Sequence, residues 1–181
     1  MRTIEDLRSI KAQYEKNVAD KEKRGVPSIL VHMGTCGIAN GADEVYKAIL
    51  AEIKVLNISE VVVTQTGCPG LCYDEPLITV SIPGETPYIY GRITPSNARE
   101  IARKHLVEQQ PMAEWLVNRD DQARILKFEE LNYIKHQMRI ALRNCGRIDP
   151  ESLEDYIAQD GYFAARCFAT ISRALSAVIR P

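Results

Sequence analysis

The sequence predicts an α/β protein with a mixed four-stranded sheet and flanking helices, preceded by an N-terminal helix and followed by a helical tail. Three observations support this class. Short β-branched runs alternate with amphipathic helical stretches between residues 28 and 107. The turn Pro83-Gly84 joins the last two runs as a hairpin. A charged stretch with apolar residues at helical spacing precedes this block from residue 3.

The elements are expected in a definite order. Residues 1–25 are interpreted as a docking helix, with its helical part over residues 3–24 and an end at Gly25-Val26-Pro27. Residues 26–117 form the expected domain. Its elements are strands at 28–31, 60–64, 77–81 and 87–91, a loop at 32–40, and helices at 41–56 and 95–107 capped by Asn40 and Thr94.

The helical crossover makes the first two strands parallel, and this connection is expected to be right-handed. The hairpin adds antiparallel strands at the edge. This is the thioredoxin-like order in a shortened form. Residues 118–181 are expected to contain a polar linker at 118–127, a helix capped by Asp149-Pro150, and a last helix over 162–179. This tail is too small to hold a core alone, so we expect it to pack on the first part or on a partner.

Composition limits the function classes. The 181 residues are 45% hydrophobic and 26% charged with a net charge of −1, which favours a soluble globular protein and argues against nucleic-acid binding. No apolar run approaches the roughly 20 residues of a membrane span, and no signal-peptide core is present, so a cytoplasmic location is expected. An odd number of cysteines, five, disfavours a disulfide framework.

Two loops carry the chemistry, and each holds two candidate soft ligands that are separated by three residues. The first pair is His32 and Cys36, and the second is Cys68 and Cys72. Thiolates bind iron–sulfur clusters and zinc, and imidazole suits zinc and iron. Neighbouring glycines let the backbone approach such a centre, and the positive end of the helix at residue 41 favours thiolates. The spacing is not that of dithiol oxidoreductases.

These four residues are therefore the candidate ligands of one metal centre. The carboxylates of Asp74 and Glu75 follow the second pair directly. They could be ligands in principle, but we expect them to solvate the loop.

A resemblance is carried by four stretches: Met33–Ala39, Gln65–Cys72, Glu75-Pro76 and Tyr90–Pro95. With them, residues 28–117 resemble the thioredoxin-like [2Fe-2S] ferredoxin module of NADH dehydrogenases and NAD(P)-linked bifurcating hydrogenases. The family's first loop has two cysteines separated by four residues. Here His32 stands at the first place, and Cys36 lies one place early. The resemblance implies a [2Fe-2S] cluster with His32 or another group as fourth ligand, or a scaffold that has lost the cluster.

A second stretch, Arg139–Tyr156, resembles the start of the flavin-containing, NADH-binding subunit of the same enzymes. The Gly-rich loop that holds the flavin in that subunit is not in this sequence. The resemblance therefore implies that FMN and NADH do not bind to this chain alone, which is expected to be a short subunit or a fragment. Cys145 matches a family cysteine that is not a ligand.

The leading hypothesis is electron transfer by a [2Fe-2S] cluster within an NAD(P)H-linked flavin and iron–sulfur oxidoreductase, either a hydrogenase or a dehydrogenase. No catalysis is expected from this chain alone. Expected partners are flavin/NADH-binding and iron–sulfur or hydrogenase subunits, or a second copy of the chain. Two alternatives are a structural zinc site made of three cysteines and one histidine, and a metal-free adaptor that docks partner subunits.

Overall fold

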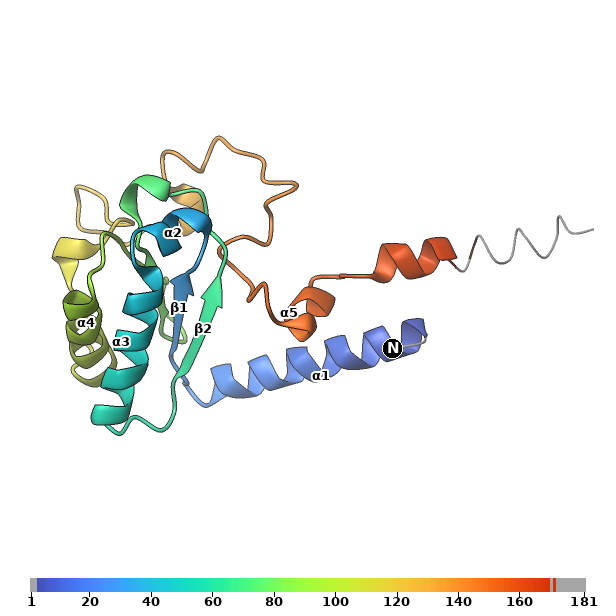
Figure 1. The fold of residues 1–181 in the computed structure, drawn as a ribbon, viewed down its shortest axis with the longest axis horizontal. Helices are drawn as coiled ribbons and strands as arrows, with labels where there is room; N and C mark the ends of the chain where they lie inside the picture. The colour runs from blue at the N-terminus through green and yellow to red at the C-terminus, as the bar shows by residue number, and fades with distance from the viewer. Residues whose placement is uncertain (1–2, 170, 172–181) are drawn as a thin grey trace, which may run out of the picture. The chain divides into compact units, whose positions relative to one another are not determined.

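The computed structural model describes residues 3–169 and residue 171 (Figure 1). Residues 22–148 form one compact unit, and residues 1–21 with 149–181 are grouped in a second. Among the described helices, none combines the length and the apolar character that crossing a membrane requires.

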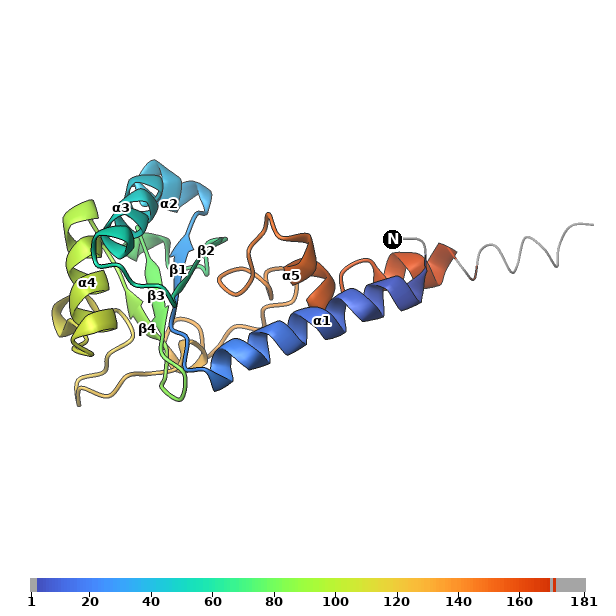
Figure 2. The ribbon, with the colours of Figure 1, turned by 90° about the horizontal axis from the view of Figure 1, so that it is seen from below.

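The larger unit is built on the predicted mixed sheet, whose strands are β1 (Ser28–His32), β2 (Val62–Thr66), β3 (Ile78–Ser81) and β4 (Tyr88–Tyr90), in the order β2-β1-β3-β4. The strands β1 and β2 are parallel, while β3 is antiparallel to both β1 and β4 (Figure 2). This confirms the thioredoxin-like order. The second strand begins two residues later than its predicted start at Glu60.

Two helices, α3 (Ala42–Val55) and α4 (Pro95–Val107), cover one face of this sheet (Figure 2). Alternate residues of β1, Ile29 and Val31, pack with Val45 and Ile49 of α3 in the core. Each such buried side chain contributes about 1.5–3 kcal/mol of hydrophobic free energy. The predicted cap of α4 is confirmed, because Thr94 Oγ1 accepts a hydrogen bond from the N–H of Asn97 at 3.3 Å.

The segment predicted as a loop at 32–40 contains a short helix, α2 (Thr35–Ala39), so that prediction was wrong in part. Asn40 ends α2 and does not cap α3, since its Nδ2 donates to the Cys36 carbonyl at 2.8 Å. The residue before α3 is Gly41, whose φ of +92° suits glycine far better than any residue with a β-carbon. The sharp turn between α2 and α3 explains why Asn40 ends one helix instead of capping the next.

The β4 edge is closed by residues 112–126. The Val117 N–H donates to the Ile89 carbonyl at 2.8 Å, beside the short helix η2 (Ala113–Trp115). The fully buried Asn118 accepts from the Ile89 N–H at 2.9 Å and donates to the carbonyls of Pro87 and Leu126 at 2.8 Å. The start of the expected polar linker is therefore bonded to the sheet.

The other face of the sheet is lined by irregular chain that includes η3 (Phe128–Glu130). A third short helix, η1 (Cys72–Asp74), lies between β2 and β3. The peptide bond between Glu75 and Pro76 is cis.

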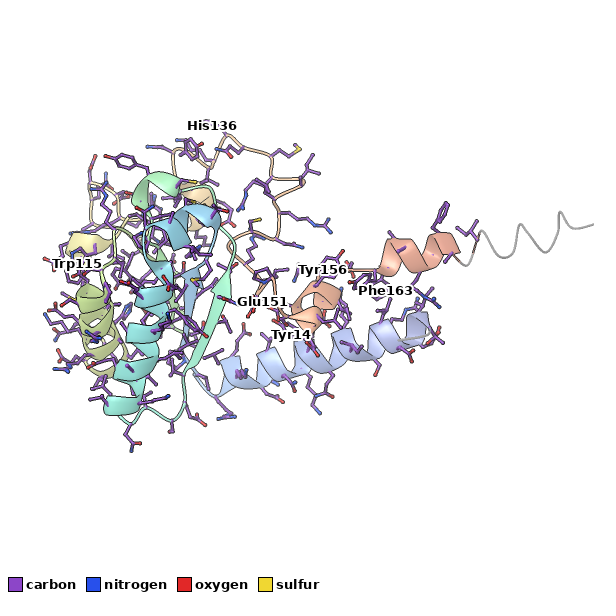
Figure 3. The ribbon with its side chains drawn as sticks, viewed as in Figure 1. Tyr14, Trp115, His136, Glu151, Tyr156 and Phe163 are labelled. Carbon is purple, nitrogen blue, oxygen red and sulfur yellow. The ribbon has the colours of Figure 1, made fainter. Side chains whose placement is uncertain are left out.

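The smaller unit contains most of α1 (Ile4–Lys23), which confirms the predicted first helix, and α5 (Leu153–Ala158). Figure 3 shows Tyr14 on α1 and Tyr156 on α5. Burial and a hydrogen bond to Asp155 raise the pKa of Tyr14. The cap of α5 is Ser152, whose Oγ accepts from the Asp155 N–H at 3.1 Å.

The predicted cap Asp149-Pro150 was therefore wrong. A hydroxyl one residue before the helix satisfies its free N–H groups, and Asp149 lies too far upstream to do so. The predicted last helix, 162–179, is helical at 163–169 and at 171. Its remaining residues from 172 onward lie outside those that the structure describes.

Candidate metal centre

Three of the four predicted ligands converge. Cys36 lies in the first turn of α2, Cys68 lies in the loop after β2, and Cys72 begins η1. The Cys72 sulfur is 3.4 Å from that of Cys36 and 3.5 Å from that of Cys68. All three sulfurs lie within 4.8 Å of one another, so this group, the sulfur triad, could hold a metal ion.

Two glycines make room for this convergence. A β-carbon on Gly34 would lie 2.6 Å from Cys68 Cβ, and one on Gly37 would lie 2.3 Å from the His32 carbonyl oxygen. Both distances are shorter than atoms can approach. Gly34 therefore lets the first loop meet the loop that carries Cys68, and Gly37 lets α2 fold back against the end of β1. The pairing of β1 and β2 also continues into the loops through a 2.7 Å bond from the Met33 N–H to the Thr66 carbonyl.

The local environment favours a protonated thiol on Cys68 in the absence of metal. Burial is the main cause that raises the pKa of the Cys68 thiol, and the thiols of Cys72 and Cys36 add to it, followed by the carboxylate of Glu75. The Gly70 N–H, 3.4 Å from the sulfur, acts in the opposite direction. A bound cation would displace this proton, because metals bind the thiolate form.

Glu75 is buried, and this contradicts the expectation that it solvates the loop. Only 6% of its surface is exposed. Its Oε2 accepts from the Leu77 N–H at 2.9 Å, whereas Oε1 has no hydrogen-bond partner of normal geometry. Burial raises the pKa of the Glu75 carboxyl, and the Leu77 N–H and the Cys68 thiol oppose that rise.

Its neighbour Asp74 behaves differently. It forms an ion pair with Arg92 at 3.0 Å. Of these two carboxylates, only Asp74 has a charged partner. Glu75 is buried without one. Sequence reasoning named Glu75 but predicted it to be solvated, although its place before an apolar strand was visible.

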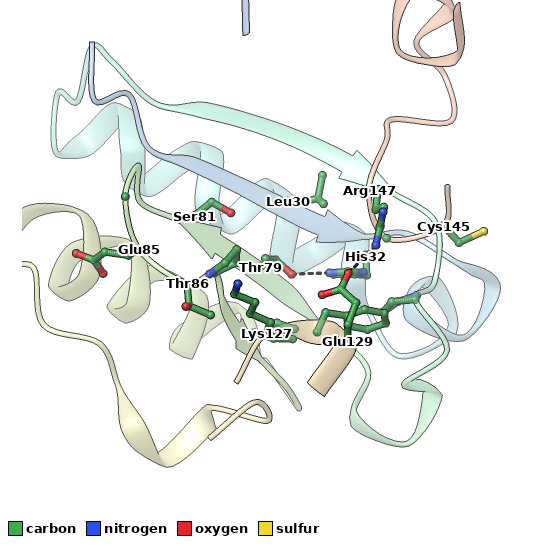
Figure 4. A pocket seen from close by; sticks show the side chains of 16 residues that line it. Leu30, His32, Thr79, Ser81, Glu85, Thr86, Lys127, Glu129, Cys145 and Arg147 are labelled. Atoms are coloured by element: carbon green, nitrogen blue, oxygen red, sulfur yellow. Dashed lines mark hydrogen bonds and ion pairs between the residues drawn. The ribbon is translucent and has the colours of Figure 1, made fainter. Parts of the chain in front are cut away.

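His32 is the last residue of β1 and lies outside the sulfur triad. It is 2% exposed, its Nε2 is 2.9 Å from Thr79 Oγ1, and its Nδ1 has no hydrogen-bond partner of normal geometry (Figure 4). Burial lowers the pKa of His32 to about 4, so the ring is neutral near pH 7. The assignment of His32 as a ligand stays a prediction.

A cavity of about 580 Å³ lies beside His32 on the face of the sheet away from α3 and α4 (Figure 4). Sheet residues such as Leu30 and Thr79 line it on one side, and Lys127, Glu129 and Arg147 line it on the other. Arg147 and Glu129 form an ion pair at 2.6 Å. This cavity could not be predicted from the sequence, because the residues that line it lie far apart along the chain.

The remaining cysteines do not join the triad. Cys145 lines the cavity, and its sulfur would be 3.7 Å from a β-carbon placed on Gly67. Cys167 is exposed in the smaller unit. Neither residue was predicted to be a ligand.

The fold and the sulfur triad together define a thioredoxin-like α/β protein whose cysteines could hold a metal. The chain is similar to the NADP-reducing hydrogenase subunit HndB of Solidesulfovibrio fructosivorans, with 27% identity over 113 residues that cover 62% of this chain and 90% of that one. A stretch of 28 residues is 71% identical to the NADP-reducing hydrogenase subunit HndC of the same organism. That stretch covers 16% of this chain and 6% of HndC.

No family model matches the chain. Among solved structures, the thioredoxin-like [2Fe-2S] ferredoxin from Aquifex aeolicus aligns with a TM-score of 0.46 and 22% identity. The alignment covers 51% of this chain and 90% of that one. A similarity of this size transfers no role to any residue.

Proposed function

We propose that this chain is an electron-transfer subunit that carries a [2Fe-2S] cluster on Cys36, Cys68 and Cys72. The observation that carries the proposal is the convergence of three cysteine sulfurs, from two loops, within 4.8 Å of one another. Thiolates are the ligands that iron–sulfur clusters use, and loops at strand ends can bring them together. When bound, such a cluster takes up and releases one electron at a time.

The residues of the chain fit this group at three of its four ligand positions. The space left by Gly34 and Gly37 allows the backbone to approach closely. The Gly70 N–H donates to the Cys68 sulfur, the kind of contact that adjusts a reduction potential. Cys72 is exposed, which gives electrons a short route to the surface. For the fourth position, the sequence predicts His32 or another group that it does not identify.

The proposal includes a partner. HndB is by its name a subunit of an NADP-reducing hydrogenase, and the chain is also similar to a short stretch of HndC. Several large apolar side chains of the larger unit are exposed in one irregular segment: Tyr133, Met138, Ile140 and Leu142. Such a group favours a contact with another subunit. We infer an association in the cytoplasm with a flavin- or hydrogenase-type subunit, and a homodimer is the alternative.

The test is the metal content of the protein prepared without oxygen. We expect equal amounts of iron and acid-labile sulfide, visible absorption, and an electron paramagnetic resonance signal after reduction by dithionite. Cys68→Ser should lose most of the iron, whereas the control Cys145→Ser should retain it. A colourless protein without iron would contradict the proposal.

A single zinc ion is a second candidate, and one observation favours it. Sulfurs bound to one tetrahedral zinc at about 2.3 Å lie roughly 3.8 Å apart. The separations of 3.4 and 3.5 Å within the sulfur triad are close to that value. The same analysis decides, because a zinc protein is colourless and contains one zinc ion and no sulfide. If the chain binds neither iron nor zinc, the remaining hypothesis is the metal-free adaptor that docks partner subunits.

A further inference from the structure

We propose that Glu75 supplies the fourth ligand of this centre through its Oε1 atom. The inference rests on the proposed function, because it assigns a residue to the cluster that the three cysteines would hold. The sequence places Glu75 just after the second cysteine pair but predicts that it solvates the loop.

The Glu75 carboxylate is fixed in place by its own loop. Its Oε2 is held by the Leu77 N–H at 2.9 Å. The backbone on both sides is also held, since the Asp74 carbonyl accepts from the Arg92 N–H at 2.7 Å and the Pro76 carbonyl accepts from the Ile93 N–H at 3.1 Å. A ligand needs this kind of fixed support.

The carboxylate also lies on the side of the loop that meets the cysteines. A β-carbon on Gly37, the residue after Cys36, would be 3.1 Å from Glu75 Oε2 and 3.4 Å from its carboxyl carbon. Glu75 itself belongs to the other loop, three residues after Cys72. Glu75 therefore borders both loops that supply the sulfurs.

The free oxygen of Glu75 is costly unless something binds it. The side chain is 6% exposed, and Oε1 has no hydrogen-bond partner of normal geometry. A buried carboxylate without a compensating partner destabilises the folded protein. A metal cation offers that compensation, and carboxylate oxygens bind both iron and zinc.

His32 is the competing ligand, and its surroundings are less favourable. Its Nδ1, like Glu75 Oε1, has no hydrogen-bond partner of normal geometry, but the ring lines the cavity on the open face of the sheet, where its Nε2 is 2.9 Å from Thr79 Oγ1. Neither His32 nor Glu75 lies within the sulfur triad. That is compatible with a two-iron cluster, in which the ligands are divided between two metals. Glu75 is favoured because it comes from the loop that supplies two of the three sulfurs.

A protonated Glu75 that only donates a hydrogen bond to the Cys68 sulfur is a different arrangement with a different outcome. It would change the reduction potential of the cluster but leave the ligands of both irons unchanged. Mössbauer spectroscopy of protein loaded with isotopically enriched iron separates the two, because it reports the ligands of each iron.

The experiment compares Glu75→Gln with Asp74→Asn, its matched neighbour. The glutamine keeps the shape and the acceptor for the Leu77 N–H but is a poor ligand. We expect Glu75→Gln to change the doublet of one iron and to retain iron about tenfold less well against a chelator. Asp74→Asn should match the wild type in both. If Glu75→Gln does not fold, as judged by circular dichroism, Glu75→Asp is measured in the same way.

Several results would overturn the assignment. Unchanged doublets and unchanged iron retention in Glu75→Gln would exclude ligation, even with an altered potential. A strong nitrogen hyperfine coupling in pulsed paramagnetic resonance that disappears in His32→Gln would assign the position to His32. If the wild type itself binds no iron, the proposed function fails and this assignment fails with it. If the wild type binds a cluster and Glu75→Gln does not differ, only the assignment of Glu75 fails.

Discussion

The β4 edge and the cysteine end of the sheet treat their buried polar groups differently. At the β4 edge, Asn118 makes three hydrogen bonds, and Tyr90 Oη lies 2.8 Å from His105 Nδ1 while it accepts from the Met112 N–H. At the cysteine end, His32 Nδ1 and Glu75 Oε1 have no hydrogen-bond partner of normal geometry. In the described residues of the larger unit, these two are the only buried side-chain polar atoms of this kind.

The difference separates residues that stabilise the fold from residues that are available for a ligand. A satisfied buried polar group is costly to remove, whereas an unsatisfied one weakens the protein as it stands. Substitutions at the β4 edge should therefore lower stability and leave metal binding intact. Substitutions at the cysteine end should mainly affect metal binding.

The largest loss of stability is expected for Asn118→Ala. The change leaves the Ile89 N–H and the carbonyls of Pro87 and Leu126 without their partner, so unfolding in urea should show a loss of about 2–4 kcal/mol. The exposed control Asn132→Ala should stay within about 0.5 kcal/mol of the wild type. Loss of iron in Asn118→Ala while the protein remains folded would break the separation between the two regions.

Gly34→Ala should have its main effect on the metal. Its new β-carbon would overlap the Cys68 β-carbon at 2.6 Å and push the two loops apart. We expect most of the iron to be lost, with a cost of about 1–3 kcal/mol in stability. In the control Gly67→Ala, the nearest atom is 3.7 Å away, so iron content should not change. A fully loaded Gly34→Ala protein would show that the loops tolerate wider spacing.

Tyr90→Phe tests the satisfied network at the β4 edge. Removal of the hydroxyl leaves His105 Nδ1 and the Met112 N–H without a partner, which should cost about 1–2 kcal/mol in thermal or urea unfolding. Tyr88→Phe is the control, because its hydroxyl bonds only to Glu85 in an exposed position. Equal effects of the two changes would mean that the buried network adds little.

The smallest effect is a pH dependence of stability at His105. Burial lowers the pKa of this residue below its ordinary 6.5, and Glu85 only partly opposes the shift. Above pH 6.5 the ring is neutral in both states. As the pH falls below 6.5, the unfolded chain takes up the proton first, so stability decreases.

His32 adds a slope of the same sign, since its pKa is also lowered. The contribution of His105 is therefore the difference between the wild type and His105→Gln in urea unfolding measured at several pH values. An identical pH slope in both proteins would show that His105 titrates normally in the folded state.

The order of the strands and long helices could be predicted because it depends on local patterns. The β-branched run after Pro27, the Thr94 cap and the apolar spacing of α3 and α4 each act within a few residues. The boundaries that differ, at Asn40 and at Asp149, lie where a turn or a nearby hydroxyl replaced the expected cap. The same local patterns predicted that Cys36, Cys68 and Cys72 follow the ends of neighbouring strands.

The burial of Glu75 could not be predicted in this way. It depends on Gly37, which lies on another loop and leaves room for the carboxylate. The position of His32 outside the sulfur triad could not be predicted either, because its Nε2 lies 2.9 Å from Thr79 Oγ1 of the neighbouring strand β3. Both outcomes are products of tertiary packing and not of spacing along the chain.

The closeness of the three thiols has a consequence for handling the protein. Cys36 and Cys72 have sulfurs 3.4 Å apart, and Cys72 is exposed. Without metal, an oxidant that removes two electrons and two protons from this pair would join them in a disulfide. Such a bond would consume two of the three thiolates. Loss of metal and exposure to air would then trap the chain in a form that only a reductant could reload.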